Sequence, residues 1–278
     1  ATSSDEIKNK IDEELVLHQS FASGLQSDMK RDIERAKEDN SIQVLVIDLQ
    51  KVLTLPRAST SLLYYTRNFN IYNFNVHEKG NGNFYVWTEI DASRGSREIA
   101  SCLIRHLKEN LLEATKEVII WSDSCSGQNR NHIVACMLLH HLHTIENSNL
   151  AQITFKFLKS GHTYNICDAD FAVLEKCIRK QQNISSLDDY LMLMRTCKVS
   201  NPFNVIEMSK NDFIESKTIL ANVTKRDFDH DSKEKVYWLN THELKLTKGF
   251  PFSLFLRGKP SDEFKVLNYA KLKKKVEI

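Results

Sequence analysis

Hydrophobic and polar residues follow patterns along the chain that predict strands and helices in turn. Residues 42–48 and 118–121 are short apolar runs rich in Val and Ile, which are typical of buried strands. Residues 62–77 and 84–90 alternate aromatic or β-branched residues with polar ones, and the Gly-Asn-Gly-Asn segment between them predicts a hairpin turn. Residues 152–158 are a fifth predicted strand.

Amphipathic segments lie before and between these strands. Residues 4–39 carry apolar side chains at three- and four-residue steps and predict one long N-terminal helix. Residues 98–112, 131–143 and 171–181 predict shorter helices. This order predicts an α/β fold with a mixed five-stranded sheet, ordered 3-2-1-4-5 and flanked by helices, which is the order of the ribonuclease H-like fold.

We expect three parts in the chain. Residues 1–40 form the N-terminal amphipathic helix, and residues 41–182 form the ribonuclease H-like core. Residues 183–278 form a small C-terminal α+β appendage with a basic tail. Its strands are predicted at residues 204–208, 235–239, 243–246 and 252–256.

Composition narrows the class of protein. The 278 residues are 41% hydrophobic and 27% charged, as in a soluble globular protein. No apolar run approaches the roughly 20 residues of a membrane span, so we expect no membrane contact. The six cysteines have no CxxC spacing, which predicts reduced intracellular thiols and no zinc site. Since the chain begins with Ala1, we expect it to be part of a longer protein.

Two of the predicted strands end in an aspartate. Asp48 ends residues 42–48, and Asp123 follows residues 118–121 after one serine. Ligands of open α/β sheets bind beyond the carboxyl ends of the strands, and two close carboxylates are costly unless a cation lies between them. Mg²⁺ prefers such oxygen ligands. The alternative is that each aspartate only caps a helix or a turn.

A third acidic cluster follows the fifth strand. Asp168 stands at the predicted start of the helix that follows, where it either caps the helix as its N-cap or faces a shared metal. Asp170 and Glu175 are further acids in this segment. His162 precedes them as an ordinary loop histidine, a ligand or a proton shuttle.

These motifs resemble a group of uncharacterised, transposon-derived proteins of animal genomes. The similar segments are Asp48-Leu-Gln, Ser122-Asp123-Ser-Cys-Ser-Gly-Gln128-Asn129, Gly161-His162-Thr and Asp168-Ala-Asp170, with Ser93-Arg94-Gly95 as a further match. The likeness extends from about residue 48 to residue 175. It implies a ribonuclease H-like core of the DDE transposase or integrase type.

The resemblance implies two-metal chemistry on nucleic acid. Two Mg²⁺ or Mn²⁺ ions roughly 4 Å apart would stabilise the attacking and leaving oxygens of a phosphodiester displacement. Asp48 would bridge the ions, Asp123 would hold one ion and Asp168 the other. Further metal candidates are Asp170 and Glu89. The residues expected to position substrate or water are Gln128, Asn129 and His162.

The same resemblance sets the expected partners. We expect DNA rather than RNA as the substrate, contacted by Arg94, Lys271, Lys273 and Lys274, because lysine-rich segments bind phosphate backbones. A nuclear location and a homodimer formed through the N-terminal helix are further expectations. If the protein is a transposase, its end-recognition domain is expected outside this sequence.

Two other functions compete with a metal-dependent nuclease or transposase. The first is a domesticated relative that keeps the fold, has weak or lost catalysis, and binds nucleic acid or a protein. The second is an α/β phosphohydrolase that uses paired aspartates and is unrelated to nucleic acid. The absence of a GxxxxGK[ST] motif excludes a P-loop ATPase.

Overall fold

The chain forms a mixed α/β fold in the computed structural model, which describes residues 2–58, 67–125, 127–146, 148–159, 165–221, 229 and 232–268. The predicted α/β class is therefore confirmed. In chain order the elements are α1 (Thr2–Glu38), β1 (Ile42–Leu49), β2 (Leu53–Leu55), β3 (Arg57–Ala58), β4 (Phe69–Glu78), β5 (Asn81–Thr88), α2 (Ser96–Asn110), β6 (Glu117–Ser122), α3 (His132–Thr144), β7 (Gln152–Phe157), α4 (Ile166–Arg179), β8 (Asn183–Ile184), α5 (Leu187–Thr196), β9 (Asn204–Glu207), η2 (Lys210–Asp212), α6 (Ser216–Leu220), η3 (Trp238–Asn240), β10 (Glu243–Thr247), β11 (Ser253–Arg257) and β12 (Lys265–Asn268).

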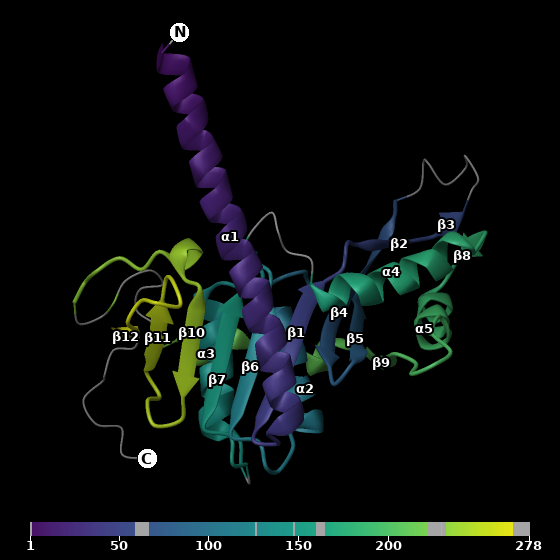
Figure 1. Ribbon diagram of the computed structural model, residues 1–278. Coiled ribbons are helices and arrows are strands. Elements are labelled where there is room, and N and C mark those ends of the chain that lie inside the picture. Colours follow the sequence, from purple (N-terminus) through teal and green to yellow (C-terminus); the bar gives the residue numbers. More distant parts are fainter. Residues whose placement is uncertain are drawn as a thin grey trace.

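One large mixed sheet forms the centre of the molecule (Figure 1). Its strands lie in the order β12-β11-β10-β7-β6-β1-β4-β5-β9, and β2 pairs with β4 beyond the end of β1. β1, β6 and β7 run parallel to one another, whereas β4 and β5 form an antiparallel hairpin beside β1. With ten strands in the described part of the chain, the sheet is twice as large as the five-stranded sheet that we predicted.

The additional strands come mostly from the C-terminal part of the chain. β9 pairs with β5, and β10 pairs with β7, so both edges of the central sheet are extended. These pairings cover the outer edges of β5 and β7, and β9 and β12 become the edge strands of the larger sheet. The residues that we expected to form a small C-terminal appendage thus contribute strands to the central sheet. The strand predicted at residues 235–239 is wrong, because a 3-10 turn, η3, occupies its end.

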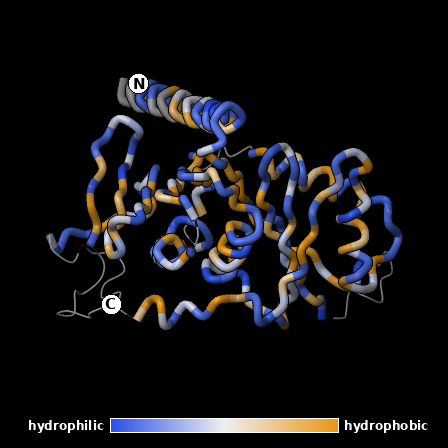
Figure 2. Tube along the Cα trace, turned by 90° about the horizontal axis from the view of Figure 1, so that it is seen from below, coloured by the Kyte–Doolittle hydropathy of each residue, from blue (hydrophilic) through white to orange (hydrophobic). Residues whose placement is uncertain are grey.

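Helices cover both faces of the sheet. α2 and α3 pack on one face, where Leu103 and Leu138 belong to the larger hydrophobic cluster. α1, α4 and α5 pack on the other face, where Met29, Leu174 and Met194 belong to the second cluster. Hydrophobic residues accordingly gather along the strands and on the inner sides of the helices (Figure 2). None of the described helices is long and apolar enough to cross a membrane, and no disulfide joins the six cysteines.

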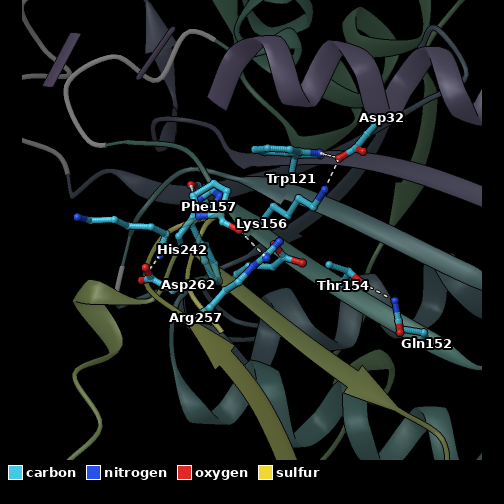
Figure 3. Close-up of polar contacts among 12 residues, drawn as sticks. Asp32, Trp121, Gln152, Thr154, Lys156, Phe157, His242, Arg257 and Asp262 are labelled. Atoms are coloured by element: carbon cyan, nitrogen blue, oxygen red, sulfur yellow. Dashed lines mark hydrogen bonds and ion pairs between the residues drawn. The ribbon is translucent and has the colours of Figure 1, made fainter. Parts of the chain in front are cut away.

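The long helix α1 is anchored to the sheet through its C-terminal half. The Asp32 carboxylate accepts hydrogen bonds from Trp121 Nε1 at 3.0 Å and from Lys156 Nζ at 2.7 Å (Figure 3). Asp32 is only 4% exposed, so this ion pair is buried between helix and sheet. Toward the N-terminus α1 extends past the sheet (Figure 1), and its apolar residues Ile11 and Leu15 are exposed there.

Replacing Asp32 with Ala is expected to lower the free energy of unfolding by about 3 kcal/mol, because the Lys156 ammonium and the Trp121 N–H lose a buried partner. Asp28→Ala is the matched control on the same helix, since Asp28 pairs with the exposed Arg31. The control is expected to cost less than about 1 kcal/mol. Urea unfolding measures both variants, and equal losses would contradict the anchoring role.

Candidate metal centre

Asp48 and Asp123 lie at the carboxyl ends of two neighbouring parallel strands. In the β1–β6 pair, Val46 lies opposite Trp121. Asp48 and Asp123 are each two residues further along, so strand alternation turns both toward the face covered by α1 and α4. The structure thus brings together the two acids that the strand pattern singled out.

The start of α4 places Asp168 over the same edge. Cys167 Sγ donates to the Val46 carbonyl at 3.2 Å, which fixes the first turn of α4 against β1. The N-cap of α4 is Asn165, and the Asp168 carboxylate accepts from the Asn165 backbone N–H at 2.9 Å in a capping box. Of the two alternatives for Asp168, the N-cap position is taken by Asn165, three residues earlier, and Asp168 is the N3 residue of the capping box.

Burial and neighbouring negative charges disturb the Asp48 carboxyl. Burial and then the charge of Asp123 raise the pKa of Asp48 to about 7, with Asp168 adding in the same direction. The Leu49 backbone N–H, 2.8 Å from Asp48 Oδ1, and the Arg94 guanidinium oppose this rise only in part. Asp48 thus stands in the field of both other acids without a full counter-charge.

More neighbouring groups stabilise the ionised form of Asp123 than that of Asp48. Burial raises the pKa of Asp123, and the charge of Asp168 adds to the rise. The hydrogen bond from Asn129 Nδ2, 2.7 Å from Asp123 Oδ1, and the Arg130 guanidinium act in the opposite direction. The predicted positioning residue Asn129 therefore holds the orientation of Asp123 directly.

The Asp48–Asp123 edge has the donors that a hard divalent cation takes. Carboxylate and amide oxygens are such donors, and Asn129, bound to Asp123 through its Nδ2, has a buried Oδ1 that accepts no hydrogen bond from any described residue. Within the described ranges, however, no three His, Cys, Asp or Glu side chains are close enough to hold one ion. One reason is that an oxygen of Asp168 is bonded within the capping box. The residues present fit one ion between Asp48 and Asp123 better than the predicted set of three acids.

Asp170 is bound by side chains of β4. Its Oδ2 lies 2.8 Å from Asn75 Nδ2 and 2.7 Å from His77 Nδ1. Residues two apart on a helix are rotated by about 200°, so Asp168 and Asp170 leave α4 in different directions. The structure therefore places Asp170 in a buried polar cluster with β4, whose Asn75 lies directly opposite Asp48 on β1.

Glu89 also lies apart from the three acids. Asp48 is opposite Asn75, which is opposite Phe84 on β5, so Glu89 is five residues further along β5. At about 3.3 Å per residue, this is on the order of 16 Å along the sheet. Glu89 is instead bound by Asn70 Nδ2 at 2.8 Å. Glu89 thus lies apart from Asp48 along the sheet, and its role as a fourth metal-binding acid stays a prediction.

The remaining predicted residues divide into two groups. Gln128 lies in the turn after Asp123, where its backbone N–H donates to the Cys125 carbonyl at 3.2 Å. Arg94 lies beside the centre, and its guanidinium donates to the Gln50 carbonyl at 3.4 Å. The residues outside the described part of the chain are His162, Lys271, Lys273 and Lys274.

Arg130 is a site residue that sequence reasoning missed. It is 8% exposed, and its guanidinium donates to the Leu239 carbonyl and to Ser124 Oγ. It also lies over the Phe157 ring, with its Cζ 4.9 Å from the ring centroid. Burial lowers the pKa of Arg130 to about 10. The one feature of the sequence that could have indicated a role for Arg130 is its position within the Gln-Asn-Arg-Asn segment.

A cavity of about 740 Å³ lies far from these residues. It is lined by parts of α2, α3 and α6 at the end of the sheet where β6 and β7 begin. None of the candidate residues lines it. Because ligands of open α/β sheets bind at the opposite, carboxyl ends of the strands, the Asp48–Asp123 edge is the better candidate for chemistry.

Comparison with known proteins places the chain in a family. Residues 68–250 match the family described as "Domain of unknown function (DUF7869)". The match covers more than half of the chain, so the protein belongs to this family. It includes Asp123, Arg130 and Asp168, whereas Asp48 precedes it. No curated protein and no solved structure matches the chain.

Replacing Asp48 with Asn is expected to raise the Tm at about pH 8 by about 5 °C. The folded-state pKa of Asp48 is raised, so the folded protein binds more protons than the unfolded chain between about pH 4 and pH 7. Stability from this group is consequently lost as the pH rises through that window. Thermal unfolding at about pH 5 and about pH 8 measures the difference between wild type and variant.

Two comparisons test whether the raised pKa of Asp48 causes this difference in Tm. Asp12→Asn, at an exposed position of α1, is expected to leave the pH dependence unchanged. Millimolar Mg²⁺ is expected to raise the Tm of the wild type at high pH and to have little effect on Asp48→Asn. An equal pH dependence in wild type and Asp48→Asn would contradict the raised pKa.

Replacing Gly82 with Ala is expected to lower the free energy of unfolding by about 1–3 kcal/mol. A Cβ at this position would lie 2.7 Å from Asp170 Oδ2 and 3.1 Å from Asn75 Oδ1, so the buried polar cluster must shift. Gly24→Ala is the control, because a Cβ there meets nothing within 4 Å and the position is helical. Chemical unfolding is expected to show the control stabilised by about 0.5–1 kcal/mol. An unchanged free energy of unfolding in Gly82→Ala would mean that the polar cluster of Asp170 and Asn75 is loosely packed.

Proposed function

We propose that the protein is a metal-dependent enzyme of phosphodiester cleavage or strand transfer, with a transposon-derived, ribonuclease H-like core. The observation that carries the proposal is the pair Asp48 and Asp123, which are half-buried at the ends of neighbouring parallel strands, with Asn129 bound to Asp123 and its own amide oxygen buried without a partner among the described residues. Such a pair is costly without a cation and suited to one with it.

The arrangement of the strands supports the same proposal. The five central strands lie in the order β5-β4-β1-β6-β7, with an antiparallel meander of β1, β4 and β5 followed by parallel β6 and β7. α2 and α3 connect β5 to β6 and β6 to β7. This is the order expected of a ribonuclease H-like core, in which the first strand lies in the middle and carries a central carboxylate.

Each residue then has a defined task. Asp48 and Asp123 would hold Mg²⁺ or Mn²⁺, with Asp168 as the candidate for a second ion. When bound, the metal supplies charge stabilisation to the reacting phosphate. Asn129 orients Asp123, and Gln128 in the same turn is placed to orient the scissile strand. Arg94 stands where its charge would meet a phosphate next to Asp48.

DNA in the nucleus is the substrate that we propose for this site. The transposon-derived group that the sequence resembles implies DNA rather than RNA. We also propose that two copies pair through α1, whose N-terminal half leaves the side chains of Ile11, Leu15 and Val16 exposed. Apolar side chains in a row on a projecting helix are typical of a helix–helix interface.

A second candidate is a domesticated, non-catalytic binding protein. The observation that favours it is that no three acidic or other metal-binding side chains of the described residues converge on one point. In this case the fold and the nucleic-acid surface remain, while cleavage is weak or lost. The same assay distinguishes the two candidates.

Wild-type protein is expected to cut labelled DNA in Mg²⁺ or Mn²⁺ but not in EDTA, and Asp123→Asn is expected to lower the rate by at least about a hundredfold, since a ligand of the reacting metal is lost. Single-stranded, duplex and hybrid substrates are assayed in parallel. Glu89→Gln is the matched control, because Glu89 lies far from the centre, and its rate should equal that of the wild type.

Two results would change the conclusion. Binding of DNA without cutting by the wild type would favour the domesticated binding protein. Cutting that survives in both Asp123→Asn and Asp48→Asn would place the reaction elsewhere in the protein and contradict the proposed centre.

A further inference from the structure

A second cavity, of about 430 Å³, adjoins the candidate metal centre. It lies between α1, the end of β7, η3 and the turn after β11. Among the residues that line it are Ser124, which directly follows Asp123, and the basic residues Arg130, Lys159, His242 and Lys259. Of these four side chains, only Arg130 also acts on the metal centre described above, through its charge on Asp123.

Arg130 on the wall of this cavity is a buried cation with no contacting counter-ion in the described part of the chain. Its neighbours are the Leu239 carbonyl, Ser124 Oγ at 2.9 Å and the Phe157 ring. Among the described residues it forms no ion pair, and its buried Nε has no hydrogen-bond partner. Asp123 acts on it only from a distance. Burying a guanidinium is costly unless an anion pairs with it, so the wall of this cavity lacks a negative partner.

The rim of the cavity is also positive. Lys159 and Lys259 are exposed, and neither forms an ion pair with a described residue. The nearby Asp262 carboxylate accepts from the Lys259 backbone N–H at 2.9 Å, and Figure 3 shows it below His242. Arg257, in contrast, is neutralised by its ion pair with Glu243. The positive charge left over is therefore concentrated at Arg130 and the two lysines.

The rings of His242 and Phe21 also line this cavity. His242 Nδ1 lies 3.0 Å from the Phe157 carbonyl, and burial lowers the pKa of His242, so its ring is neutral near pH 7 (Figure 3). Phe21 of α1 packs edge-on against His242, with 6.0 Å between ring centroids. His242 is buried and Phe21 is half-buried. Accessible rings interleaved with cations are typical of surfaces that bind a nucleic-acid strand, and Phe21 is such a ring.

We propose that this cavity binds a backbone phosphate of a nucleic-acid strand, with the Arg130 guanidinium as its buried donor and Lys159 and Lys259 at its entrance. The planar guanidinium fork matches the geometry of phosphate oxygens. Because Ser124 follows Asp123 in the chain, a strand held here continues directly toward the metal centre. The inference rests on the proposed function, since it names the subsite that delivers the strand.

The test uses fluorescence anisotropy to measure the binding of fluorescein-labelled single-stranded and duplex DNA to the full chain in EDTA. The measurement is repeated over a range of salt concentrations. Lys159→Gln combined with Lys259→Gln is expected to weaken binding by about tenfold and to reduce the slope of log Kd against log salt by about 1 for each lysine. Lys210→Gln, an exposed lysine of η2 that does not line this cavity, is the matched control and should bind as the wild type does.

Arg130→Lys separates charge from geometry. It keeps the positive charge but lacks the two-pronged fork, so it is expected to bind DNA several-fold more weakly than the wild type with an unchanged Tm. If this variant unfolds, the lysine pair still decides the matter because both lysines are exposed. DNA binding that is equal in the wild type and the lysine double variant overturns the phosphate subsite, as does the absence of DNA binding in the wild type.

The subsite and the proposed catalysis fail in different ways. Asp123→Asn is expected to keep DNA binding in EDTA while losing cleavage. Lysine-dependent binding without cleavage by the wild type would support the subsite and contradict catalysis. Cleavage with lysine-independent binding would support catalysis and contradict the subsite.

Discussion

The parallel pairing of β1 with β6 is the constraint on which the candidate centre depends. In-register parallel strands turn equivalent residues to one face, so an aspartate at the end of each strand puts Asp48 and Asp123 side by side. The surroundings reduce the resulting repulsion only in part, through the Leu49 N–H, the Asn129 amide and the charges of Arg94 and Arg130. The fold thus holds a local excess of negative charge at one edge of its sheet, which is the condition under which a cation binds.

The C-terminal strands contribute to this edge as much as the central ones do. β10 pairs with β7, and the segment before it forms η3, whose Leu239 carbonyl accepts from Arg130. Arg130 in turn donates to Ser124 beside Asp123. A buried cation is thereby set behind the anionic pair, held from a part of the chain 109 residues away. Residues 232–268 are therefore part of the site and not an appendage to it.

These contacts explain which features the sequence could predict. Asp48 and Asp123 could be placed because a strand, its end and its parallel neighbour are local patterns. The sequence could not decide between Asp168 and Asn165 as the N-cap because both residue types cap helices, and the choice depends on where the backbone enters the first turn. The distance of Glu89 from Asp48 could not be predicted, since the position of Glu89 along the sheet depends on the hairpin register. Arg130 could not be predicted to be buried, since its neighbours come from distant elements.

Whether Asp168 could join the proposed metal centre depends on its capping box, which favours the capped position when no metal is bound. Leaving the capping box would cost Asp168 about 1 kcal/mol. The pKa of Asp48 is raised from 3.8 to about 7, which corresponds to roughly 4 kcal/mol of unfavourable interactions of its ionised form. If a divalent cation relieved half of these unfavourable interactions, the gain would exceed the cost of moving Asp168 out of its capping box. Metal binding and the rearrangement of the first turn of α4 would therefore be coupled. The acids would then take one arrangement without the metal and another with the metal bound.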